Sequence, residues 1–455
     1  MTQFLQFKDL IDFVLIQNYY ITDESLGDIQ MLDIRFIREN PDVVKNAYQV
    51  KGFDDNVDEI LALDARVREL KTTTQSMTAE KNKITREIPT ASDKAPLIAR
   101  SKEIANEIAA DMAELADKEA VLNDLMHRVP QIPDASAPIG PDDTANTVVR
   151  RVGTPREFDF APRAQWDLLD MNGWWLPEKI GKICGTRTYA LVGEAAELQL
   201  AIETYVIQKL IAKGFTFVEC PSITKPQTIF DAGHFMGSDL AVMDNDVFML
   251  AGTDRCLTGT AEIILNSLHS GEILNEKDLP IKYAGFSPCF RKEAGAAGRD
   301  TRGLARFHQF NKVEQYIFCT PAQSNEMHEH ILNNLCEVIE DLELPYRVIA
   351  NSTGDMGFNK VKMNDVEAWV PSENAYKELG SCSSIGQFQA RRTNTRYRDK
   401  NGDVQFVATL NNTGIAVPRA LVPILENHQN ADGSVNIPKK LQPLMGGRTK
   451  IGGKH

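Results

Sequence analysis

The 455-residue sequence lacks the features that mark several specialised classes of protein. No run of apolar residues approaches the roughly 18 that a membrane-spanning helix needs. The seven cysteines are odd in number and scattered, without a CxxC pair, so they predict reduced cytoplasmic thiols rather than disulfides or a Cys-type zinc site. With 42% hydrophobic and 25% charged residues, the composition is that of an ordinary globular protein and excludes a disordered or collagenous chain.

An excess of basic residues is also missing. The chain has 63 acidic and 50 basic residues, whereas proteins that coat nucleic acid are normally basic, so any RNA binding would depend on local basic patches. Residues 1–30 have neither the basic segment nor the small-residue cleavage site of a secretory signal, and they lack the Arg/Ser bias of a transit peptide. We expect them to form a peripheral N-terminal extension, unless the chain starts at Met31.

Residues 60–129 predict a long helical hairpin. Positions spaced alternately three and four apart are mostly apolar in two runs. The first run is Ile60, Leu63, Val67, Leu70, Thr74, Met77, Lys81, Ile84 and Ile88, and the second is Leu97, Ile104, Ile108, Leu115, Leu122, Leu125 and Val129. Pro89 and the small polar residues after it break the helix. We therefore predict an antiparallel coiled coil within an arm domain of residues 31–130, then a linker over 131–150 and a second domain over 151–455.

The charges on this arm are divided between its two ends. Residues 71–102, at the expected tip, carry seven basic and three acidic groups, whereas residues 103–128 carry two basic and seven acidic groups. A basic tip on an acidic stalk suits the phosphate backbone of an RNA that is held away from the body. The alternative is an ordinary solvated helix face on which charges cluster by chance.

After residue 150, short apolar strands alternate with helices. The pattern predicts helices over 197–212 and 416–427, and strands over 215–218, 281–284, 312–318 and 404–410. This mixture predicts an α+β fold with an antiparallel sheet. Neither GxGxxG nor GxxxxGKS/T occurs, so neither a dinucleotide-binding fold nor a P-loop is indicated.

The residues best suited to bind a charged ligand are concentrated between 286 and 314. Arg291, Arg299, Arg302 and Arg306 accompany three glycines in this stretch. Arginine can grip phosphate or carboxylate oxygens with two parallel hydrogen bonds, and the glycines would let the connecting loop move over a ligand. The alternative is a surface loop whose arginines are placed by chance.

These motifs resemble those of a known family. Arg291-Lys-Glu293 followed by Arg306-Phe-His308-Gln309-Phe310 resembles motif 2 of the class II aminoacyl-tRNA synthetases. Gly414-Ile-Ala-Val-Pro-Arg419-Ala resembles motif 3, and the helix and strand before Pro221 resemble motif 1, the dimer element. The seryl-tRNA synthetases within this class are indicated by Thr260-Ala261-Glu262, Thr353-Gly-Asp-Met-Gly357, Ser381-Cys382-Ser383, Gln389-Ala-Arg391-Arg392 and the helix that holds Glu426-Asn427. The resemblance runs from about Met31 to Gly447, arm included.

The resemblance implies a class II antiparallel sheet with flanking helices behind the coiled-coil arm, and sites for ATP, Mg²⁺ and L-serine. The residues implied to bind ATP are Arg291, Lys292, Glu293, Arg306, Phe310, Glu378, Leu379, Gly380, Ser381 and Arg419. Those implied to bind serine are Thr260, Ala261, Glu262, Arg291, Glu314 and Thr413. Arg291 and Arg419 would be catalytic, and Glu378 and Ser381 would hold Mg²⁺ together with the phosphates.

The implied activity is ligation of serine to tRNA(Ser), and also to tRNA(Sec), by a cytoplasmic homodimer. The arm residues implied to contact tRNA are Lys71, Lys81, Lys83, Arg86 and Arg100. Two alternatives stay open. One is a relative that adenylates an amino acid and loads a carrier protein, although such relatives generally lack the arm. The other is a catalytically inactive regulator or RNA-binding scaffold, which the presence of Arg291, Glu378 and Arg419 disfavours.

The sequence departs from the family pattern at a few positions. Asn411-Asn412-Thr413-Gly414 stands where the family usually has Asn-Gly-Ser-Gly, so we expect a slightly smaller serine pocket. Gly380 replaces a frequent Ser, Pro418 a frequent Gly, and Ser384-Ile385-Gly386 differs from a common Asn-Phe pattern. His328 and His330, two residues apart, would not share a helix face, so we expect no metal there. We interpret His269, His308 and His428 as structural.

Overall fold

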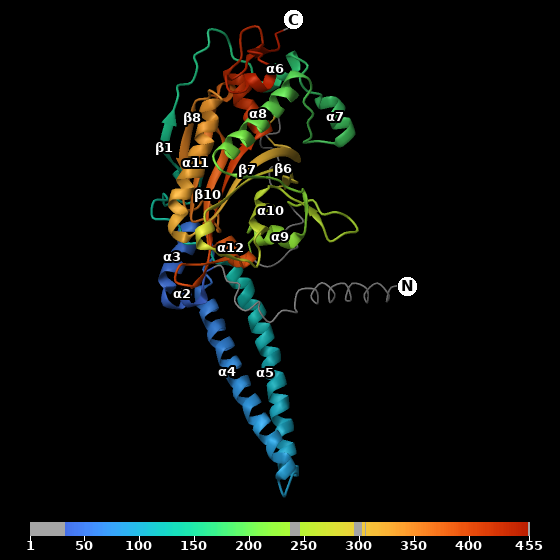
Figure 1. Ribbon diagram of the computed structural model, residues 1–455, viewed down its shortest axis with the longest axis vertical. Helices are drawn as coiled ribbons and strands as arrows, with labels where there is room; N and C mark the ends of the chain where they lie inside the picture. Colours follow the sequence, from blue (N-terminus) through green and yellow to red (C-terminus); the bar gives the residue numbers. More distant parts are fainter. Residues whose placement is uncertain (1–31, 237–245, 295–302, 305, 454–455) are drawn as a thin grey trace.

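The computed structural model describes residues 32–236, 246–294, 303–304 and 306–453. Within these ranges, two long helices extend side by side from an α+β body (Figure 1). The predicted fold class, a mainly antiparallel sheet with helices behind a helical arm, is confirmed. The expected extension over 1–30, the start of the arm domain at Met31, and Arg299 and Arg302 lie outside the described residues.

The arm consists of α4 (Val57–Glu87) and α5 (Ala95–Arg128), joined by the short 3-10 turn η1 (Ile88–Thr90). At 1.5 Å per residue, the 31 residues of α4 reach roughly 46 Å. Every predicted seam position of α4 is buried or half-buried, which confirms the three-four spacing, and Pro89 lies where the first helix ends. Arg66 of α4 and Glu114 of α5 pair across the seam, with Nε 2.8 Å from Oε1.

The root of the arm has a small apolar core of its own. Two short helices, α2 (Ile34–Glu39) and α3 (Pro41–Lys51), pack there against the body-proximal ends of α4 and α5. The buried apolar residues of this core are Ile34, Ile37, Val44, Tyr48, Val57, Ile60, Val67, Leu122, Met126 and Val129. The thin seam of the hairpin is therefore supported at the end where the arm joins the body.

The body is organised around an eight-stranded sheet in the order β1-β8-β9-β10-β13-β7-β6-β2. Neighbouring strands are antiparallel, except that β2 runs parallel to β6. The strands are β1 Thr147–Val152, β2 Thr216–Glu219, β6 Ile281–Phe290, β7 Gln309–Cys319, β8 Tyr346–Ala350, β9 Lys362–Val370, β10 Ala375–Gly386 and β13 Ala408–Ala416. Residues 147–150, expected in the linker, thus belong to β1 at one edge of the sheet.

Helices and short strands complete the body. The helices are α6 Gln165–Met171, α7 Pro177–Cys184, α8 Glu194–Ala212, α9 Pro226–Asp231, α10 Glu262–Ser267, α11 Ser324–Asp341, α12 Phe388–Thr393 and α13 Val417–Asn427. The short strands are β3 Ile223–Thr224, β4 Cys256–Leu257, β5 Ile273–Asn275, β11 Arg396–Arg398, β12 Val404–Phe406, β14 Val435–Asn436 and β15 Lys450–Ile451. None of the helices in the described residues is both long and apolar enough to cross a membrane.

Strand β7 is buried on both faces over residues 313–319, so the polar side chains of Glu314 and Gln315 lie in the interior beside apolar ones. Val313 and Ile317 point to the main core, which also contains side chains of α8, α11 and α13. Tyr316 and Phe318 point to a second apolar cluster with residues of α10 and α12. Because side chains alternate along a strand, Glu314 shares the face of Tyr316 and Phe318.

The prediction of one strand over 404–410 is wrong. Val404–Phe406 pairs with β11 in a three-stranded sheet, whereas Ala408–Ala416 enters the main sheet between β10 and β7. The chain changes sheets at Val407, which is completely buried beside Tyr397 and Phe318 in the second cluster. No glycine or proline marks this corner, so the local sequence reads as a single apolar run.

Candidate active site

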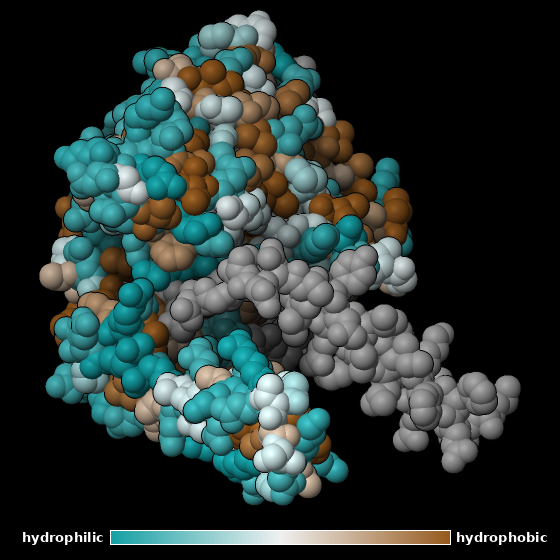
Figure 2. Space-filling model, turned by 60° about the horizontal axis from the view of Figure 1, so that its bottom comes forward, coloured by the Kyte–Doolittle hydropathy of each residue, from teal (hydrophilic) through white to brown (hydrophobic). Residues whose placement is uncertain are grey.

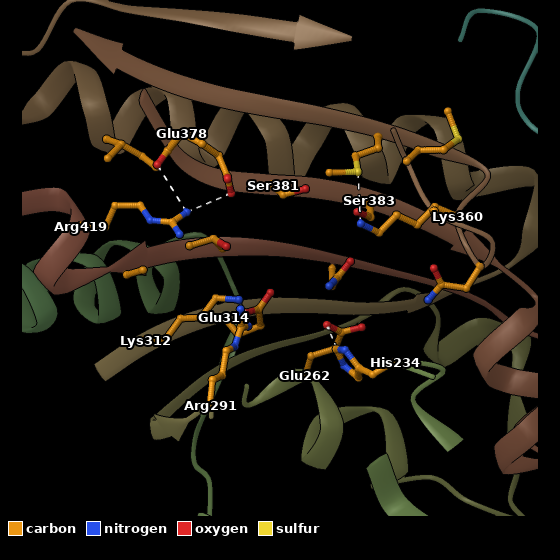
Figure 3. A pocket seen from close by; sticks show the side chains of 18 of the residues that line it. His234, Glu262, Arg291, Lys312, Glu314, Lys360, Glu378, Ser381, Ser383 and Arg419 are labelled. Atoms are coloured by element: carbon orange, nitrogen blue, oxygen red, sulfur yellow. Dashed lines mark hydrogen bonds and ion pairs between the residues drawn. The ribbon is translucent and has the colours of Figure 1, made fainter. Parts of the chain in front are cut away.

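One open cavity of about 500 Å³ collects most of the predicted site residues (Figure 3). Its walls come from β7, β10, β13, the start of α13 and the segment 355–360. The predicted residues that line it are Glu262, Arg291, Glu293, Arg306, Phe310, Glu314, Glu378, Leu379, Ser381, Thr413 and Arg419. Residues from positions 262 to 419 of the chain thus converge on a single space.

Four predicted site residues do not line this cavity. Thr260 lines a smaller neighbouring cavity, which shares Arg291 and His234 with the main one, and its hydroxyl donates to Glu314 Oε2 at 3.2 Å. Ala261 is completely buried next to it. The Lys292 backbone N–H donates to the Asp246 carbonyl at 3.0 Å, and Gly380 lies in β10 between Leu379 and Ser381, both of which line the cavity.

At one end of the cavity, α13 and β10 bring together a cation and two oxygen donors (Figure 3). Arg419 Nη1 lies 3.2 Å from Glu378 Oε1. Glu378 and Ser381 are three positions apart, a spacing that places side chains on opposite faces of a regular strand. A β-bulge between Glu378 and Gly380 adds one residue to β10, so both side chains reach the same cavity.

The other end contains two buried carboxylates. Glu314 is fully buried and is ion-paired with Lys312 on the same face of β7. Burial raises the pKa of the Glu314 carboxyl, and the Lys312 ammonium opposes this shift. Burial likewise raises the pKa of Glu262, whose Oε1 accepts a hydrogen bond from Gln389 Nε2 at 2.8 Å. An ammonium group placed between these carboxylates would be stabilised strongly because little water competes there.

Beside Glu262 lies His234, with Nε2 3.7 Å from Glu262 Oε2. Desolvation in the cleft, aided by the charges of Arg291 and Lys312, lowers the pKa of this imidazole, so it is neutral at pH 7. At this distance the imidazole packs beside the carboxylate without a hydrogen bond to it, and a neutral ring does not cancel the charge of the carboxylate. The Glu262 carboxylate therefore stays available for a positively charged ligand.

Arg291 and its neighbours form the side of the cavity near β6 and β7. The Arg291 backbone N–H donates to the His308 carbonyl at 2.9 Å, and its guanidinium lies 5.5 Å from the centre of the Phe310 ring. Glu293 has a positive φ of 54°, a conformation that costs a non-glycine residue roughly 1–2 kcal/mol. Its carboxylate accepts a hydrogen bond from Arg306 Nη1 at 2.9 Å. Such backbone strain is typical of functional sites.

Glu378 and Ser381 offer hard oxygen ligands of the kind that Mg²⁺ prefers. Behind them, Asp365 is paired with Ser381 across β9 and β10, and burial together with the Glu378 charge raises the pKa of Asp365 to about 6. A divalent cation would relieve this crowding of negative charge, so the donor set fits Mg²⁺. No cluster of three or more His, Cys, Asp or Glu side chains suited to a metal occurs in the described residues, so the remaining ligands would be phosphate oxygens or water.

Several cavity residues carried no predicted role. They are His234, Lys312, Asp355, Asn359, Lys360 and Asn411. Lys312 and Asn411 could have been found from the alternation of β7 and from the quoted motif around Thr413, respectively. Asp355 belongs to the quoted 353–357 motif. His234, Asn359 and Lys360 have no local signal, because only the tertiary fold brings them to the cavity.

The departures at Gly380 and Thr413 are neighbours in space. A Cβ atom added at Gly380 would lie 2.8 Å from both Leu335 Cδ2 and Thr413 Cβ, and 3.2 Å from the Thr413 methyl Cγ2. The extra methyl of Thr413 is thus the loosest of these three contacts, and the space at 380 is limited mainly by Leu335 and by the Thr413 Cβ that a serine would share.

We expect Gly380→Ser alone to lower the free energy of unfolding by about 1–3 kcal/mol through overpacking. Adding Thr413→Ser removes only the contact at 3.2 Å and should recover less than half of that loss. Urea unfolding of the two single variants and the double variant measures the coupling. Strictly additive effects would show that the two sites are independent.

The five arm residues implied to contact tRNA fall into two groups. Lys71 pairs with Glu119, and Arg100 pairs with Glu80 and Glu103. Lys81, Lys83 and Arg86, near the tip of α4, have no ion-pair partner within the described part of the chain. The charges available to an external anion are therefore concentrated at the far end of the arm.

Comparisons with known proteins agree over nearly the whole chain. The family model of the seryl-tRNA synthetase N-terminal domain matches residues 31–133, and that of the tRNA synthetase class II core domain (G, H, P, S and T) matches residues 251–428. The serine–tRNA ligase of Deinococcus radiodurans is 44% identical over 426 residues, which are 93% of this chain and 99% of that protein. The serine–tRNA ligase of Methanoregula boonei is 43% identical over 427 residues, 92% of this chain and 99% of that protein.

Solved structures give the same result. The seryl-tRNA synthetase from Pyrococcus horikoshii complexed with ATP matches with a TM-score of 0.87 and 36% identity, over 92% of this chain and 99% of that one. The cytoplasmic serine–tRNA ligase from Naegleria fowleri in complex with AMP matches with a TM-score of 0.83 and 30% identity, over 94% and 99%. The chain therefore belongs to the seryl-tRNA synthetase family of the class II aminoacyl-tRNA synthetases.

Proposed function

We propose that this chain activates L-serine with ATP to form seryl-adenylate and then transfers the seryl group to the 3′-terminal ribose of tRNA(Ser). The observation that carries the proposal is the convergence of Arg291, Glu314, Glu378 and Arg419 on one cavity. The relatives named serine–tRNA ligase, and the related structures with ATP and AMP, support the same reaction for this chain.

In the first step, the serine carboxylate attacks the α-phosphorus of ATP and pyrophosphate leaves. The nucleophile is already charged, so alignment and charge neutralisation, rather than a protein base, carry the catalysis. Arg291 bridges the α-phosphate and the serine carboxylate, while Arg306 and Arg419 hold the outer phosphates. Phe310 stacks on the adenine ring and Glu293 accepts from its amino group. Glu378 and Ser381 would hold Mg²⁺ together with the phosphates, and the ion would supply further positive charge for the leaving pyrophosphate.

Binding of ATP would replace ion pairs that are present without it. Arg419 is paired with Glu378, and Arg306 with Glu293. These pairs hold each arginine near its working position, so little side-chain entropy remains to be lost when phosphates bind.

Selection of serine rests on the buried end of the cavity. Glu262 and Thr260 take the ammonium group, and Glu314 and Thr413 hydrogen-bond the hydroxyl. The Oε1 atom of Glu314 is buried and lacks a hydrogen-bond partner among the described residues, so it offers an acceptor to the substrate. An amino acid without a hydroxyl would leave this buried acceptor without a hydrogen bond, which lowers the affinity for that amino acid.

In the second step, the terminal ribose hydroxyl of tRNA attacks the adenylate and AMP leaves. The arm domain, residues 31–130, would hold the tRNA backbone through Lys71, Lys81, Lys83, Arg86 and Arg100, since RNA duplexes are read mainly by backbone and shape. The same reaction extends to tRNA(Sec), and we place the activity in the cytoplasm. Residues 147–455 would form the catalytic domain, because β1 already belongs to the main sheet, with 131–146 as linker and 1–30 as a dispensable extension.

We also propose a homodimer through the motif 1 region. Figure 2 shows hydrophobic patches on the body, whereas the arm in front of it is mostly hydrophilic. Large apolar side chains are more than one third exposed around α7, α8, β2 and β3, namely Ile183, Val192, Leu200, Ile211, Phe217 and Ile223. β2 also lies at an edge of the main sheet. A second copy would cover this apolar surface and the open sheet edge.

Pyrophosphate exchange with serine, threonine, alanine and glycine in parallel tests the activation step. We expect kcat/KM for serine to exceed that for alanine by about 10⁴-fold, because alanine cannot satisfy Glu314. Threonine should also be rejected, since its methyl group would overpack the pocket. Absence of serine-dependent exchange would refute the proposal. Exchange without charging of tRNA would favour the carrier-loading alternative.

A further inference from the structure

Lys51 is a lysine in an unusual place. It is the last residue of α3 at the root of the arm, and only 3% of it is exposed. Its ammonium donates to three backbone carbonyl oxygens of the body, those of Lys360 at 2.6 Å, Gly357 at 2.9 Å and Phe358 at 3.4 Å. An ammonium has three donors, so all of them are used. Burial and the nearby charge of Lys360 lower the pKa of Lys51 to about 7. If the position served packing alone, burying an apolar side chain there would cost less free energy than burying a lysine.

The carbonyls belong to a segment that forms part of the active-site wall. Gly357, Phe358, Asn359 and Lys360 all line the main cavity. They have no regular secondary structure, so their backbone carbonyls are not held by a helix or a sheet. Charge-assisted hydrogen bonds to three carbonyls within four residues, those of 357, 358 and 360, can fix such a segment in one conformation.

From this segment a chain of contacts leads to the proposed serine site. Asn359 Nδ2 donates to the Gly233 carbonyl at 3.1 Å. His234, the next residue, places Nε2 3.7 Å from Glu262 Oε2. Figure 3 shows His234 and Glu262 side by side in the cavity. Glu262 is the carboxylate assigned above to the serine ammonium, so the inference rests on the proposed function.

Other contacts join the same two parts of the chain. The Thr353 hydroxyl donates to the Val50 carbonyl at 2.5 Å, one residue before Lys51. The Gln131 N–H donates to the Phe358 carbonyl at 2.7 Å, and the ring of Phe53 meets the ring of Phe358 edge to face. The root of the arm thus borders the 353–360 segment at several points, and Lys51 is the only one of these residues to bring a charge.

We propose that Lys51 is a positioning residue that couples the root of the arm to the serine site. It fixes segment 357–360 and, through the hydrogen bond from Asn359 to Gly233, the position of the His234 ring that packs beside the Glu262 carboxylate. The ATP-binding end of the cavity, formed by Arg419 and Glu378, has no place in this chain of contacts. Loss of Lys51 should therefore affect serine and ATP differently.

The test is Lys51→Met in the full chain, which keeps the length of the side chain and removes its donors. In pyrophosphate exchange we expect the KM for serine to rise about tenfold or more, with the KM for ATP changed less than about twofold. Lys45→Met is the matched control, because Lys45 lies on the same helix at the surface, paired with Asp58. It should leave both KM values unchanged. A folded Lys51→Met with an unchanged KM for serine, or with equal rises for both substrates, would overturn the proposal.

A second variant covers the case in which Lys51→Met does not fold. Asn359→Ala removes only the next link, the hydrogen bond to Gly233, and should raise the KM for serine selectively. If it does not, the proposal fails. Where both variants fold, their effects on the KM for serine should be less than additive, because they break one chain of contacts. Failure of the proposed function would instead appear as a wild-type protein without serine-dependent exchange.

Discussion

Arg291→Ala is expected to reduce serine-dependent pyrophosphate exchange by at least about 10³-fold, the scale on which an arginine that stabilises a phosphoryl-transfer transition state contributes. Arg291 faces the cavity beside Phe310, whereas Arg306 on the same side is paired with Glu293. Alanine removes both the charge and the planar fork that can contact phosphate and carboxylate together. The measurement is kcat/KM for exchange, combined with thermal unfolding to verify the fold.

Two further variants make the result specific. Arg291→Lys keeps the charge without the fork, so most of the activity should still be lost if bidentate contact is required. Arg255→Ala is the surface control, because Arg255 is exposed and paired with the adjacent Asp254, and it should retain full exchange. Near-normal exchange by Arg291→Ala would refute the assigned role and, with it, the proposed alignment of the two substrates.

Shortening the arm is expected to separate the two steps of the reaction. Arg66 and Glu114 face each other across the hairpin, so replacing residues 68–112 with a short Gly/Ser linker cuts both helices at a matched level and leaves the core at the root of the arm almost intact. Charging of tRNA should fall by about 10³-fold or more, because the contacts with the phosphate backbone are lost. Pyrophosphate exchange should change less than about threefold, since the main cavity contains no residue of the removed segment.

Point changes at the tip refine this experiment. A triple variant in which Lys81, Lys83 and Arg86 become glutamine should weaken charging of tRNA. It should also make charging less sensitive to salt, because each lost phosphate contact lowers the slope of log affinity against log salt concentration by about one. Lys118→Gln on the acidic stalk is the matched control and should change neither quantity. Unaltered charging by the shortened protein would show that tRNA is not held by the arm.

The helical arm could be predicted almost completely from the sequence, because a coiled coil is specified by local periodicity. The positions of β6 and β7 were also predictable from apolar runs, although their ends extend beyond the predicted ranges. The corner at Val407 was not, because the chain changes sheets there in response to tertiary packing. Apolar pattern alone does not distinguish one long strand from two that belong to different sheets.

The candidate site was predictable to the extent that its residues lie in recognisable motifs. Arg291, Glu378 and Arg419 were named from such motifs, and they line the same cavity. The contact between Lys51 and Lys360 could not be inferred, because 309 residues separate them and neither stands in a distinctive pattern. His234 also stands in no distinctive sequence pattern, so its place in the cavity could not be inferred either. Such residues become visible only when the backbone of distant segments is placed in space.

The bulge in β10 has a consequence for how the length of this chain can vary. One residue removed between Glu378 and Ser381 would remove the bulge and leave the two side chains two positions apart, on one face of a regular strand, so both would still reach the cavity. One residue added there would turn either the carboxylate or the hydroxyl away from the cavity. The arm is different, because paired losses or gains of about seven residues in α4 and α5 preserve its seam. The arm can thus become longer or shorter in whole heptads, whereas β10 tolerates a shorter spacing at this point but not a longer one.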